Sequence, residues 1–301
     1  MDVTLDALAR SFAETGYVTT EDDQILITVF LALKLGKPLL VTGAPGVGKT
    51  EIAKVLSKAF GAELIRLQCY EGLDEHKALY EWNYQRQLLR IQMMKEQDSL
   101  AERDLFAPEY LLARPLLRAI QNEQPTVLLI DEIDKTDEEF EAFLFEVLSD
   151  FQVSIPELGT VVARQIPMVV LTSNGDRDLS DGLKRRCVFL YVDLPNVDKE
   201  YKIIQAKVPE AGEKLSYQAA CAVSLLRENL ELRKLPSISE TLDWVRALVA
   251  LDTERLNPEN VDKTLNLLLK TKEDLDAFRQ GMGSQNLVDK AVACEHKNAG
   301  R

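Results

Sequence analysis

Cysteine and histidine are scarce in this chain, and neither is arranged as a binding site. The 301 residues include four cysteines and two histidines, which stand far apart and share no C-x-x-C spacing: Cys69, Cys187, Cys221, Cys294, His76 and His296. Zinc sites and disulfide frameworks need paired or regularly spaced ligands. The sequence therefore indicates neither kind of site, and its thiols suit a reducing cytosol.

Long apolar runs and an excess of basic residues are also missing. No run of about 18 apolar residues occurs, and residues 1–10 show no apolar stretch behind a basic start, as a signal peptide would. Lysine and arginine number 36 against 49 aspartates and glutamates, which gives a net charge of −13. Motors that grip phosphate backbones normally carry a basic stripe. We therefore expect a soluble, cytoplasmic protein with no membrane span, for which nucleic acid is a disfavoured partner.

The chain is organised around a glycine-rich turn that follows the apolar run 39–41. Gly43 and Gly48 flank four residues and are followed by Lys49 and Thr50, a spacing typical of phosphate-binding loops. Glycines let backbone N–H groups surround an anion, Lys49 supplies charge to the outer phosphates, and the Thr50 hydroxyl can ligate magnesium. A helix expected over 51–60 would point its N-terminus at the phosphates. We assign nucleotide binding to Gly43, Ala44, Pro45, Gly46, Val47, Gly48, Lys49, Thr50 and Glu51.

After a second strand predicted at 63–67, a third predicted strand is followed by two acids. The continuous apolar run 127–130 is typical of a strand buried on both faces of a parallel sheet, and Asp131 and Glu132 follow it directly. A carboxylate at the C-terminal end of such a strand can hold magnesium, and the next residue can polarise an attacking water. We therefore assign the metal to Asp131 together with Thr50, and the catalytic base to Glu132. The next acids are interpreted as a solvated face, with a capping box between Thr136 and Glu139: Asp134, Asp137, Glu138 and Glu139.

Asn174 and a pair of arginines complete the candidate catalytic residues. Asn174 follows the strand predicted at 168–171, where it could orient water or contact the γ-phosphate; an Asn suited to turn geometry is the alternative. Arg185 and Arg186 form a tight basic cluster beside the predicted sheet. An arginine that reaches a neighbouring subunit's γ-phosphate accelerates hydrolysis by orders of magnitude, although most surface basic clusters have no such role.

The order of the predicted elements defines the fold class. Strands alternate with helices up to residue 195, after which only helical patterns occur. We expect an α/β fold, a P-loop NTPase parallel sheet sandwiched by helices, with a C-terminal all-helical lid domain. The expected divisions are an N-terminal strap (1–19), a nucleotide-binding domain (20–195) with a helical insertion (68–120) and a hairpin (151–166), a helical lid (196–280) and a loose tail (281–301). The insertion contains four aromatic residues near its start: Tyr70, Tyr80, Trp82 and Tyr84. We expect them to pack inside the insertion, and the alternative is that they form a surface that contacts a partner.

These features occur together in one known family. The loop 43–50, the strand end 128–134, Asn174, the arginine pair 185–186 and the trailing helical lid resemble the AAA+ ATPases over residues 20–270. Within that family, the sequence G-A-P-G-V-G-K-T, the enlarged segment after the second strand and the 151–166 hairpin resemble the MoxR branch. Residues 64–74 and 78–84 are similar to the CoxD-like members that accompany molybdenum-containing carbon monoxide dehydrogenase.

The resemblance implies a homo-oligomeric ring, commonly a hexamer, that binds ATP and magnesium between subunits. Hydrolysis would remodel a protein client or mature its metal centre, with a molybdenum hydroxylase as a candidate client and a von Willebrand factor A domain protein as a candidate co-chaperone. By the same resemblance, Asn174 is the sensor residue and Arg185 or Arg186 the trans-acting finger. The usual lid arginine is missing where residues 237–240 begin a helix, so Arg233 or Lys234 would have to replace it.

Two other functions remain open. A DNA-directed motor of the restriction or branch-migration type shares the same sheet and motifs. A nucleotide-gated binding module would bind ATP and switch an interaction with little turnover. A GTPase is disfavoured because the sequence has no Asn-Lys-x-Asp motif to recognise guanine.

Overall fold

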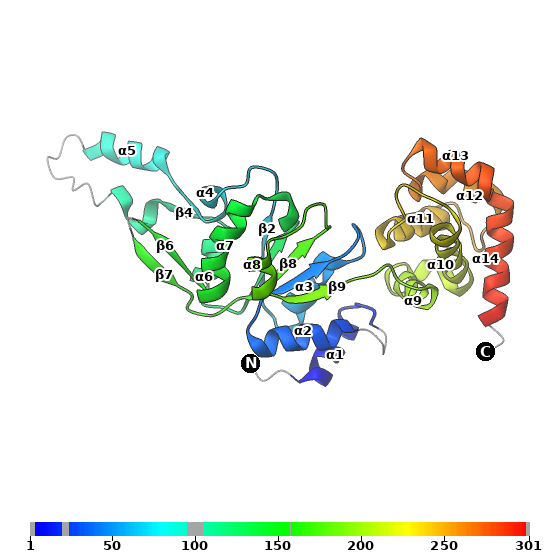
Figure 1. Cartoon of the computed structure of the whole chain (residues 1–301), viewed down its shortest axis with the longest axis horizontal. Helices are drawn as coiled ribbons and strands as arrows, with labels where there is room; N and C mark the ends of the chain where they lie inside the picture. The colour runs from blue at the N-terminus through cyan, green and yellow to red at the C-terminus, as the bar shows by residue number, and fades with distance from the viewer. Residues whose placement is uncertain (1–3, 20–23, 95–104, 157, 299–301) are drawn as a thin grey trace. The chain divides into compact units, whose positions relative to one another are not determined.

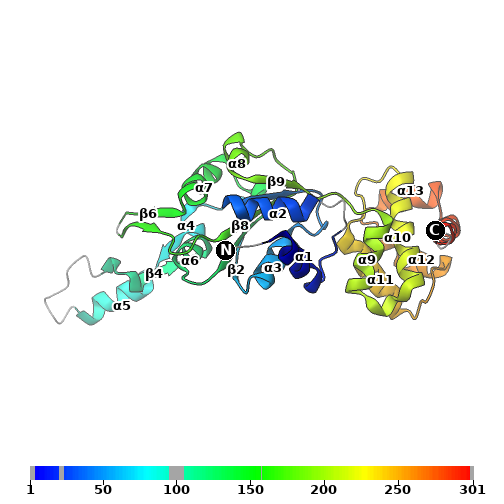
Figure 2. The same ribbon diagram turned by 90° about the horizontal axis from the view of Figure 1, so that it is seen from below.

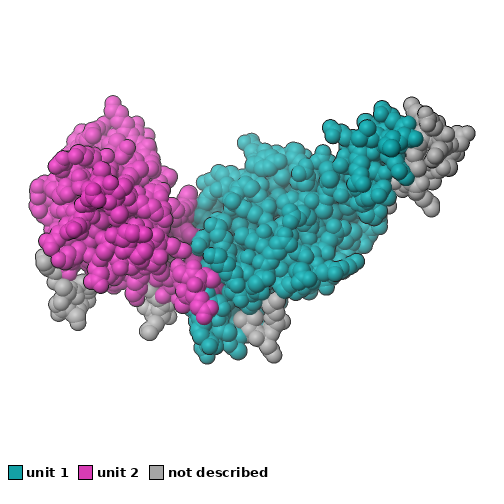
Figure 3. All heavy atoms as spheres, turned by 180° about the vertical axis from the view of Figure 1, so that it is seen from behind, with its two compact units in different colours: residues 1–11, 24–43, 49–191 teal, residues 12–23, 44–48, 192–301 magenta. Residues whose placement is uncertain are grey.

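The computed structural model describes residues 4–19, 24–94, 105–156 and 158–298 (Figure 1). The chain divides into two units, which Figure 3 shows in different colours. The first unit comprises residues 1–11, 24–43 and 49–191, and the second comprises residues 12–23, 44–48 and 192–301. The parallel sheet lies wholly in the first unit, and the helices after residue 196 lie in the second.

Five parallel strands form the sheet of the first unit, in the order β2-β5-β8-β1-β9. Their bounds are β1 (Leu39–Thr42), β2 (Glu63–Gln68), β5 (Thr126–Asp131), β8 (Met168–Ser173) and β9 (Val188–Tyr191). Because neighbouring strands run in the same direction, their carboxyl ends meet at one edge of the sheet. Asp131 and residue 173 therefore end adjacent strands at that edge, next to the turn that follows β1.

Helices cover both faces of this sheet, which is why all six residues of β5 are buried. Alternate residues of a strand point to opposite faces. Leu128 and Ile130 pack into a core with α6 (Pro115–Gln121) and α7 (Glu138–Asp150), while α3 (Lys49–Ala59) contacts the sheet through β2, β5 and β8. The predicted α/β class, a P-loop-type parallel sheet sandwiched by helices, is confirmed.

The N-terminal strap contains a helix, α1 (Leu5–Glu14), that its weak pattern did not predict. Leu8 and Phe12 are buried, and the ring of Phe12 meets Tyr17 edge to face with centroids 5.4 Å apart. The following helix, α2 (Gln24–Leu35), buries three apolar residues and contacts β9 (Figure 2). Gly36 adopts a positive φ of 59° just after α2, a conformation that glycine favours at the end of a helix.

The insertion is only partly helical. It contains the helices α4 (Glu75–Ala78), α5 (Tyr84–Met94) and the 3-10 turn η2 (Pro108–Tyr110), but also the strands β3 (Tyr80–Trp82) and β4 (Leu111–Ala113). These two strands pair antiparallel, so the predicted helical insertion also contains a small sheet. Tyr80 and Trp82 are buried with their rings edge to face, whereas Tyr70 and Tyr84 are exposed. Internal packing thus explains two of the four aromatic residues.

The predicted hairpin is confirmed. Strands β6 (Gln152–Ile155) and β7 (Gly159–Val162) pair antiparallel, and Val153 and Ile155 are buried on the side that faces the core. Helix α8 (Asp181–Arg186) then follows β8 and precedes the edge strand β9.

The second unit is built from helices around its own core. Its elements are α9 (Val197–Lys207), η4 (Pro209–Ala211), α10 (Gly212–Asn229), α11 (Ile238–Ala250), α12 (Pro258–Thr264), η5 (Leu265–Leu267), α13 (Lys272–Gly281) and α14 (Ser284–Asn298). Ser237 and Glu240 form a capping box at the start of α11. Trp244 and Phe278 lie fully buried at the centre of the core. None of the helices in the described part of the chain is long and apolar enough to cross a membrane.

The predicted loose tail is wrong for residues 284–298, which form α14. Gly283 adopts a positive φ of 71° and separates α13 from α14, so the glycines mark a turn between helices. Leu287 and Ala291 recur at helical spacing and are buried in the core of the second unit.

A buried ion pair joins three helices of the second unit. Glu200 of α9 and Arg227 of α10 form two hydrogen bonds of 2.6 and 3.0 Å, and the Thr241 hydroxyl of α11 donates to the same carboxylate at 2.7 Å. Burial raises the pKa of the Glu200 carboxyl, and the Arg227 guanidinium opposes that rise. The Nε of Arg227 donates to the Pro236 carbonyl at 2.8 Å, so this one guanidinium also fixes the segment before α11.

We expect Arg227→Met to lower the free energy of unfolding of the second unit by about 3 kcal/mol, because it leaves a buried carboxylate without its counter-charge. Urea unfolding followed by Trp244 fluorescence measures this change in a Trp82→Phe background, since these are the two tryptophans of the chain. Arg246→Met is the matched control, because Arg246 forms an exposed pair with Asp243 and should cost less than about 0.5 kcal/mol. Equal effects of the two variants would contradict the prediction.

Candidate nucleotide-binding site

The phosphate-loop residues have the backbone that the glycine pattern predicted. Gly43, Gly46 and Gly48 all have positive φ values, of 147°, 76° and 96°, which residues with a Cβ rarely adopt. Lys49 opens α3 and is buried, and its Nζ donates to the Gly43 carbonyl at 2.7 Å and to Asn174 Oδ1 at 2.8 Å. Burial lowers the pKa of the Lys49 ammonium, and the acids around it, Asp134 most strongly, oppose this change. The loop lysine and the predicted sensor residue therefore lie in direct contact.

The two predicted metal residues also lie in contact. Asp131 ends β5 with a 3% exposed surface, and its Oδ1 accepts hydrogen bonds from the Thr50 hydroxyl at 3.1 Å and the Thr172 hydroxyl at 2.5 Å. A hydroxyl and a carboxylate are the hard oxygen donors that magnesium prefers. This donor pair, between the N-terminus of α3 and the end of β5, fits a magnesium ion bound with nucleotide phosphates.

Glu132 has an unusual backbone conformation for a residue with a side chain. Its φ of 58° and ψ of 50° lie in the left-handed region, a strained geometry that clusters at functional sites. The Glu132 N–H donates to the Thr172 hydroxyl at 2.9 Å, and its Oε2 accepts from Gln68 Nε2 at 3.0 Å. Thr172, which the sequence analysis did not single out, thus fixes both Asp131 and the backbone of Glu132.

Asp134 is a structural residue of the site, and its interpretation as part of a solvated face is wrong. It is buried, and its Oδ2 accepts the backbone N–H groups of Asn174 at 3.1 Å and Asp176 at 3.0 Å. These bonds hold the turn that carries Asn174 against the end of β5. The Asp134 side chain therefore positions the predicted sensor residue.

The start of α7 also differs from its prediction. Asp137 caps the helix by accepting the Phe140 N–H, whereas the buried Thr136 hydroxyl donates to the Ile133 carbonyl. The capping box expected between Thr136 and Glu139 is wrong because the 3-10 turn η3 (Ile133–Lys135) takes up the residues before it. Asp137, Glu138 and Glu139 are exposed, as predicted.

The two arginines at the end of α8 have different environments. Arg186 is held by its own subunit: its Nε donates to Ser149 Oγ at 2.8 Å, its Nη1 donates to the Gly182 carbonyl at 3.0 Å, and its guanidinium lies 4.4 Å from the centre of the Phe145 ring. Arg185 is exposed and forms no hydrogen bond or ion pair with any residue that the structure describes. The geometry separates two residues that the sequence left equivalent.

Both candidates for the missing lid arginine have acidic partners in the second unit. Arg233 Nη1 lies 3.6 Å from Glu273 Oε1, and Lys234 Nζ lies 3.0 Å from Glu240 Oε1. Lys234 therefore binds the same glutamate that closes the capping box of α11.

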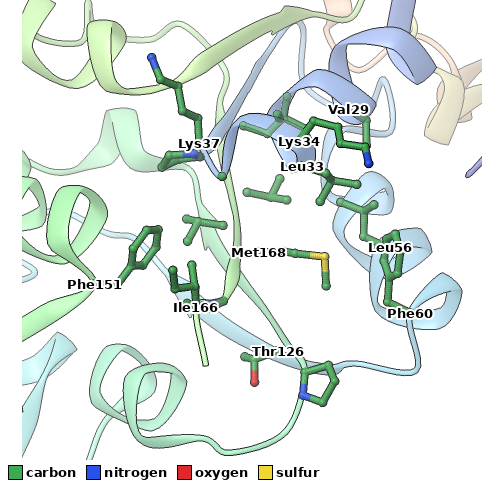
Figure 4. Close-up of a pocket in the computed structure, with 18 of the residues that line it drawn as sticks. Val29, Leu33, Lys34, Lys37, Leu56, Phe60, Thr126, Phe151, Ile166 and Met168 are labelled. Atoms are coloured by element: carbon green, nitrogen blue, oxygen red, sulfur yellow. The ribbon is translucent and has the colours of Figure 1, made fainter. Parts of the chain in front are cut away.

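A cavity of about 380 Å³ lies at the opposite edge of the sheet (Figure 4). Its lining is mostly apolar and comes from α2, α3 and the amino ends of β5 and β8, including Val29, Leu33, Leu56, Thr126 and Met168. Asp131 and Asn174 follow the carboxyl ends of the same strands. This cavity is therefore separate from the candidate nucleotide site.

Residues 38–187 match the family described as AAA domain (dynein-related subfamily), a range that contains the loop lysine, both acids, Asn174 and both arginines of α8. The chain therefore has an AAA+ core fold. The matched range ends between α8 and β9, so it contains four of the five strands of the sheet.

The similarity to curated proteins extends beyond residues 38–187 of this chain. YojN of Bacillus subtilis is 26% identical over 249 residues, which cover 80% of this chain and 74% of YojN. An uncharacterised Staphylococcus aureus protein is 27% identical over 234 residues, covering 72% of this chain and 77% of that protein. ORF529 of Acidianus two-tailed virus is 22% identical over 243 residues, and the match spans only 40% of its length.

Solved structures support the AAA+ fold. Two variants of Thermotoga maritima RuvB superpose with TM-scores of 0.51 and 0.50 at 19% and 18% identity. The first match covers 87% of this chain and 74% of the RuvB chain, and the second covers 85% and 71%. At this identity the likeness concerns the fold alone.

Proposed function

We propose that this protein is a magnesium-dependent ATP hydrolase of the AAA+ class that remodels or matures a protein client. The observation that carries the proposal is the set of contacts within one unit that joins Lys49 to Asn174 and Thr50 to Asp131. These contacts bring a phosphate-binding lysine, a metal-binding pair and a polar sensor to the carboxyl edge of one parallel sheet.

Each residue has a role that follows from its chemistry. The loop N–H groups and Lys49 bind the phosphates, and Thr50 with Asp131 would hold magnesium, which would supply positive charge to the outer phosphates. Glu132 accepts the proton of the attacking water, and Asn174 orients that water or the γ-phosphate. Thr172 and Asp134 position these groups through the hydrogen bonds described above.

Phosphate release by the purified protein tests this proposal, with and without EDTA to remove magnesium. Lys49→Ala should abolish release, because the buried charge beside the phosphates is lost. Lys54→Ala is the matched control on the same helix, since Lys54 is exposed and pairs with Glu51. Equal rates for the two variants would place any observed hydrolysis outside this site.

The finer assignment rests on the family resemblance. We infer a MoxR-type chaperone close to the CoxD-like members, which works as a homo-oligomeric ring, in the commonest case a hexamer. Its client would be a protein such as a molybdenum hydroxylase, and its co-chaperone a protein with a von Willebrand factor A domain. The net charge of −13 favours protein partners over nucleic acid. Pull-down of the tagged protein from its native cell tests the client.

A DNA motor is the second candidate function. RuvB, whose fold is similar, is described as a Holliday junction branch migration motor, but the acidic charge of this chain argues against a phosphate-gripping surface. Salt-sensitive DNA binding together with DNA-stimulated hydrolysis would favour the motor.

A nucleotide-gated module is the third candidate function. It would bind ATP with negligible turnover, and single-turnover hydrolysis on the assembled protein would separate it from the hydrolase.

A further inference from the structure

Two residues of the edge strand β2 reach the acids that follow β5. Gln68 lies beside Asp131 in the strand register, and Arg66 lies two residues earlier on the same face of β2. Arg66 Nη2 donates to Asp131 Oδ2 at 2.5 Å and also to Gln68 Oε1, while Gln68 Nε2 donates to Glu132 Oε2 at 3.0 Å. One chain of hydrogen bonds therefore connects the predicted metal residue to the predicted catalytic base.

Arg66 supplies the counter-charge of a buried carboxylate. The Asp131 side chain is 5% exposed and the Arg66 side chain 53% exposed. Asp131 Oδ1 is already occupied by the Thr50 and Thr172 hydroxyls, so Arg66 is the cation that compensates the other oxygen. A buried carboxylate without a cation is costly, which gives this contact a reason to form when no metal is bound.

We propose that Arg66 holds the cation position beside Asp131 until a divalent metal arrives, so that the guanidinium and the metal compete for the same carboxylate. This inference rests on the proposed function, because it takes Asp131 to be the metal residue. A guanidinium cannot lose its charge near neutral pH, so it cannot relieve its repulsion of a nearby metal by deprotonation. Its side chain is largely exposed and can swing away from the site.

The same movement of Arg66 also weakens the contact that holds the side chain of Glu132, the catalytic base. When Arg66 leaves Asp131, the Gln68 amide loses the donor that fixes its orientation, and the contact between Gln68 and Glu132 weakens. Metal binding and release of the base are thereby coupled through β2. Arg66 is a positioning residue in this scheme, because it acts on the site through Asp131 and Gln68.

Manganese binding measured by electron paramagnetic resonance tests the competition without relying on turnover. Manganese stands in for magnesium, and the protein is first saturated with a non-hydrolysable ATP analogue, whose own binding is measured without metal. Arg66→Met should tighten manganese binding about tenfold, the equivalent of one hydrogen bond to a charged group. Arg66→Lys keeps the charge and should stay near the wild-type value, and Arg66→Gln serves as the neutral variant if Arg66→Met does not fold.

Arg118→Met is the matched control. Arg118 is 56% exposed and pairs at 2.9 Å with Glu63, at the other end of the same strand, so its loss should leave manganese affinity unchanged.

The possible outcomes separate this inference from the proposed function. Unchanged or weaker manganese binding by the neutral Arg66 variants would overturn the competition, as would a gain by Arg118→Met of equal size. Failure of the wild-type protein to bind the nucleotide analogue would instead overturn the proposed function and the inference that rests on it.

Discussion

Glu132→Gln should retain nucleotide binding and lose turnover by at least about a hundredfold, the usual contribution of a positioned general base. The amide has almost the same shape as the carboxylate, so it can keep the hydrogen bond to Gln68 and the backbone bond to Thr172. It cannot accept a proton from water at neutral pH. Hydrolysis should therefore fall while the affinity for a fluorescent ATP analogue stays within a few-fold of wild type.

Glu139→Gln is the matched control for this prediction. Glu139 lies on the exposed surface of α7, in the same acidic stretch of sequence, and its substitution should leave the rate unchanged. Thermal unfolding of both variants checks that they are folded and as stable as the wild type. Full activity of Glu132→Gln in a preparation free of other ATPases would remove Glu132 from the role of base.

The parts of the site that the sequence predicted are those with a local signal. The loop glycines predict a backbone with positive φ values, and Lys49 and Thr50 follow them at a fixed spacing. Asp131 is recognisable because a fully apolar strand precedes it, and the structure places it beside Thr50. Each of these signals lies within about ten residues of the group it identifies.

The missed residues act through contacts that are distant in sequence. Thr172 reaches Asp131 across adjacent strands, and Asp134 binds the backbone of residues 174 and 176. Arg66 looks like an ordinary exposed residue of an edge strand until the register of β2 against β5 is known. A pattern within one segment cannot supply that register, although polar residues grouped at the end of a buried strand, as at residues 172–174, were a usable hint.

The errors of fold have the same origin. Strands β3 and β4 are three residues each, too short to show an alternating pattern, and they exist because they pair with each other. At α14 a regular element was missed. The glycines at 281 and 283 suggested a tail, although Leu287 and Ala291 are four residues apart, as on one face of a helix.

Arg185→Ala should reduce hydrolysis by about a thousandfold, the typical contribution of an arginine finger, while leaving nucleotide binding nearly intact. We infer that Arg185 is the trans-acting finger because it is exposed and has no partner among the described residues, so its guanidinium is available to a neighbouring subunit. Arg186 is instead engaged with Ser149, Gly182 and the Phe145 ring. Arg186→Ala should therefore lower stability more than Arg185→Ala does.

Mixed assemblies show whether the arginine acts between subunits. An Arg185→Ala subunit has an intact loop, and a Lys49→Ala subunit has an intact arginine, so one of the two interfaces formed between them contains a complete site. Stoichiometric mixing of the two inactive variants should restore part of the hydrolysis, because each mixed pair rebuilds one site. Mixing Arg185→Ala with the double variant Lys49→Ala, Arg185→Ala is the control and should restore nothing. If the first mixture also stays inactive although the subunits exchange, Arg185 does not act in trans, and its exposure at the end of α8 needs another explanation.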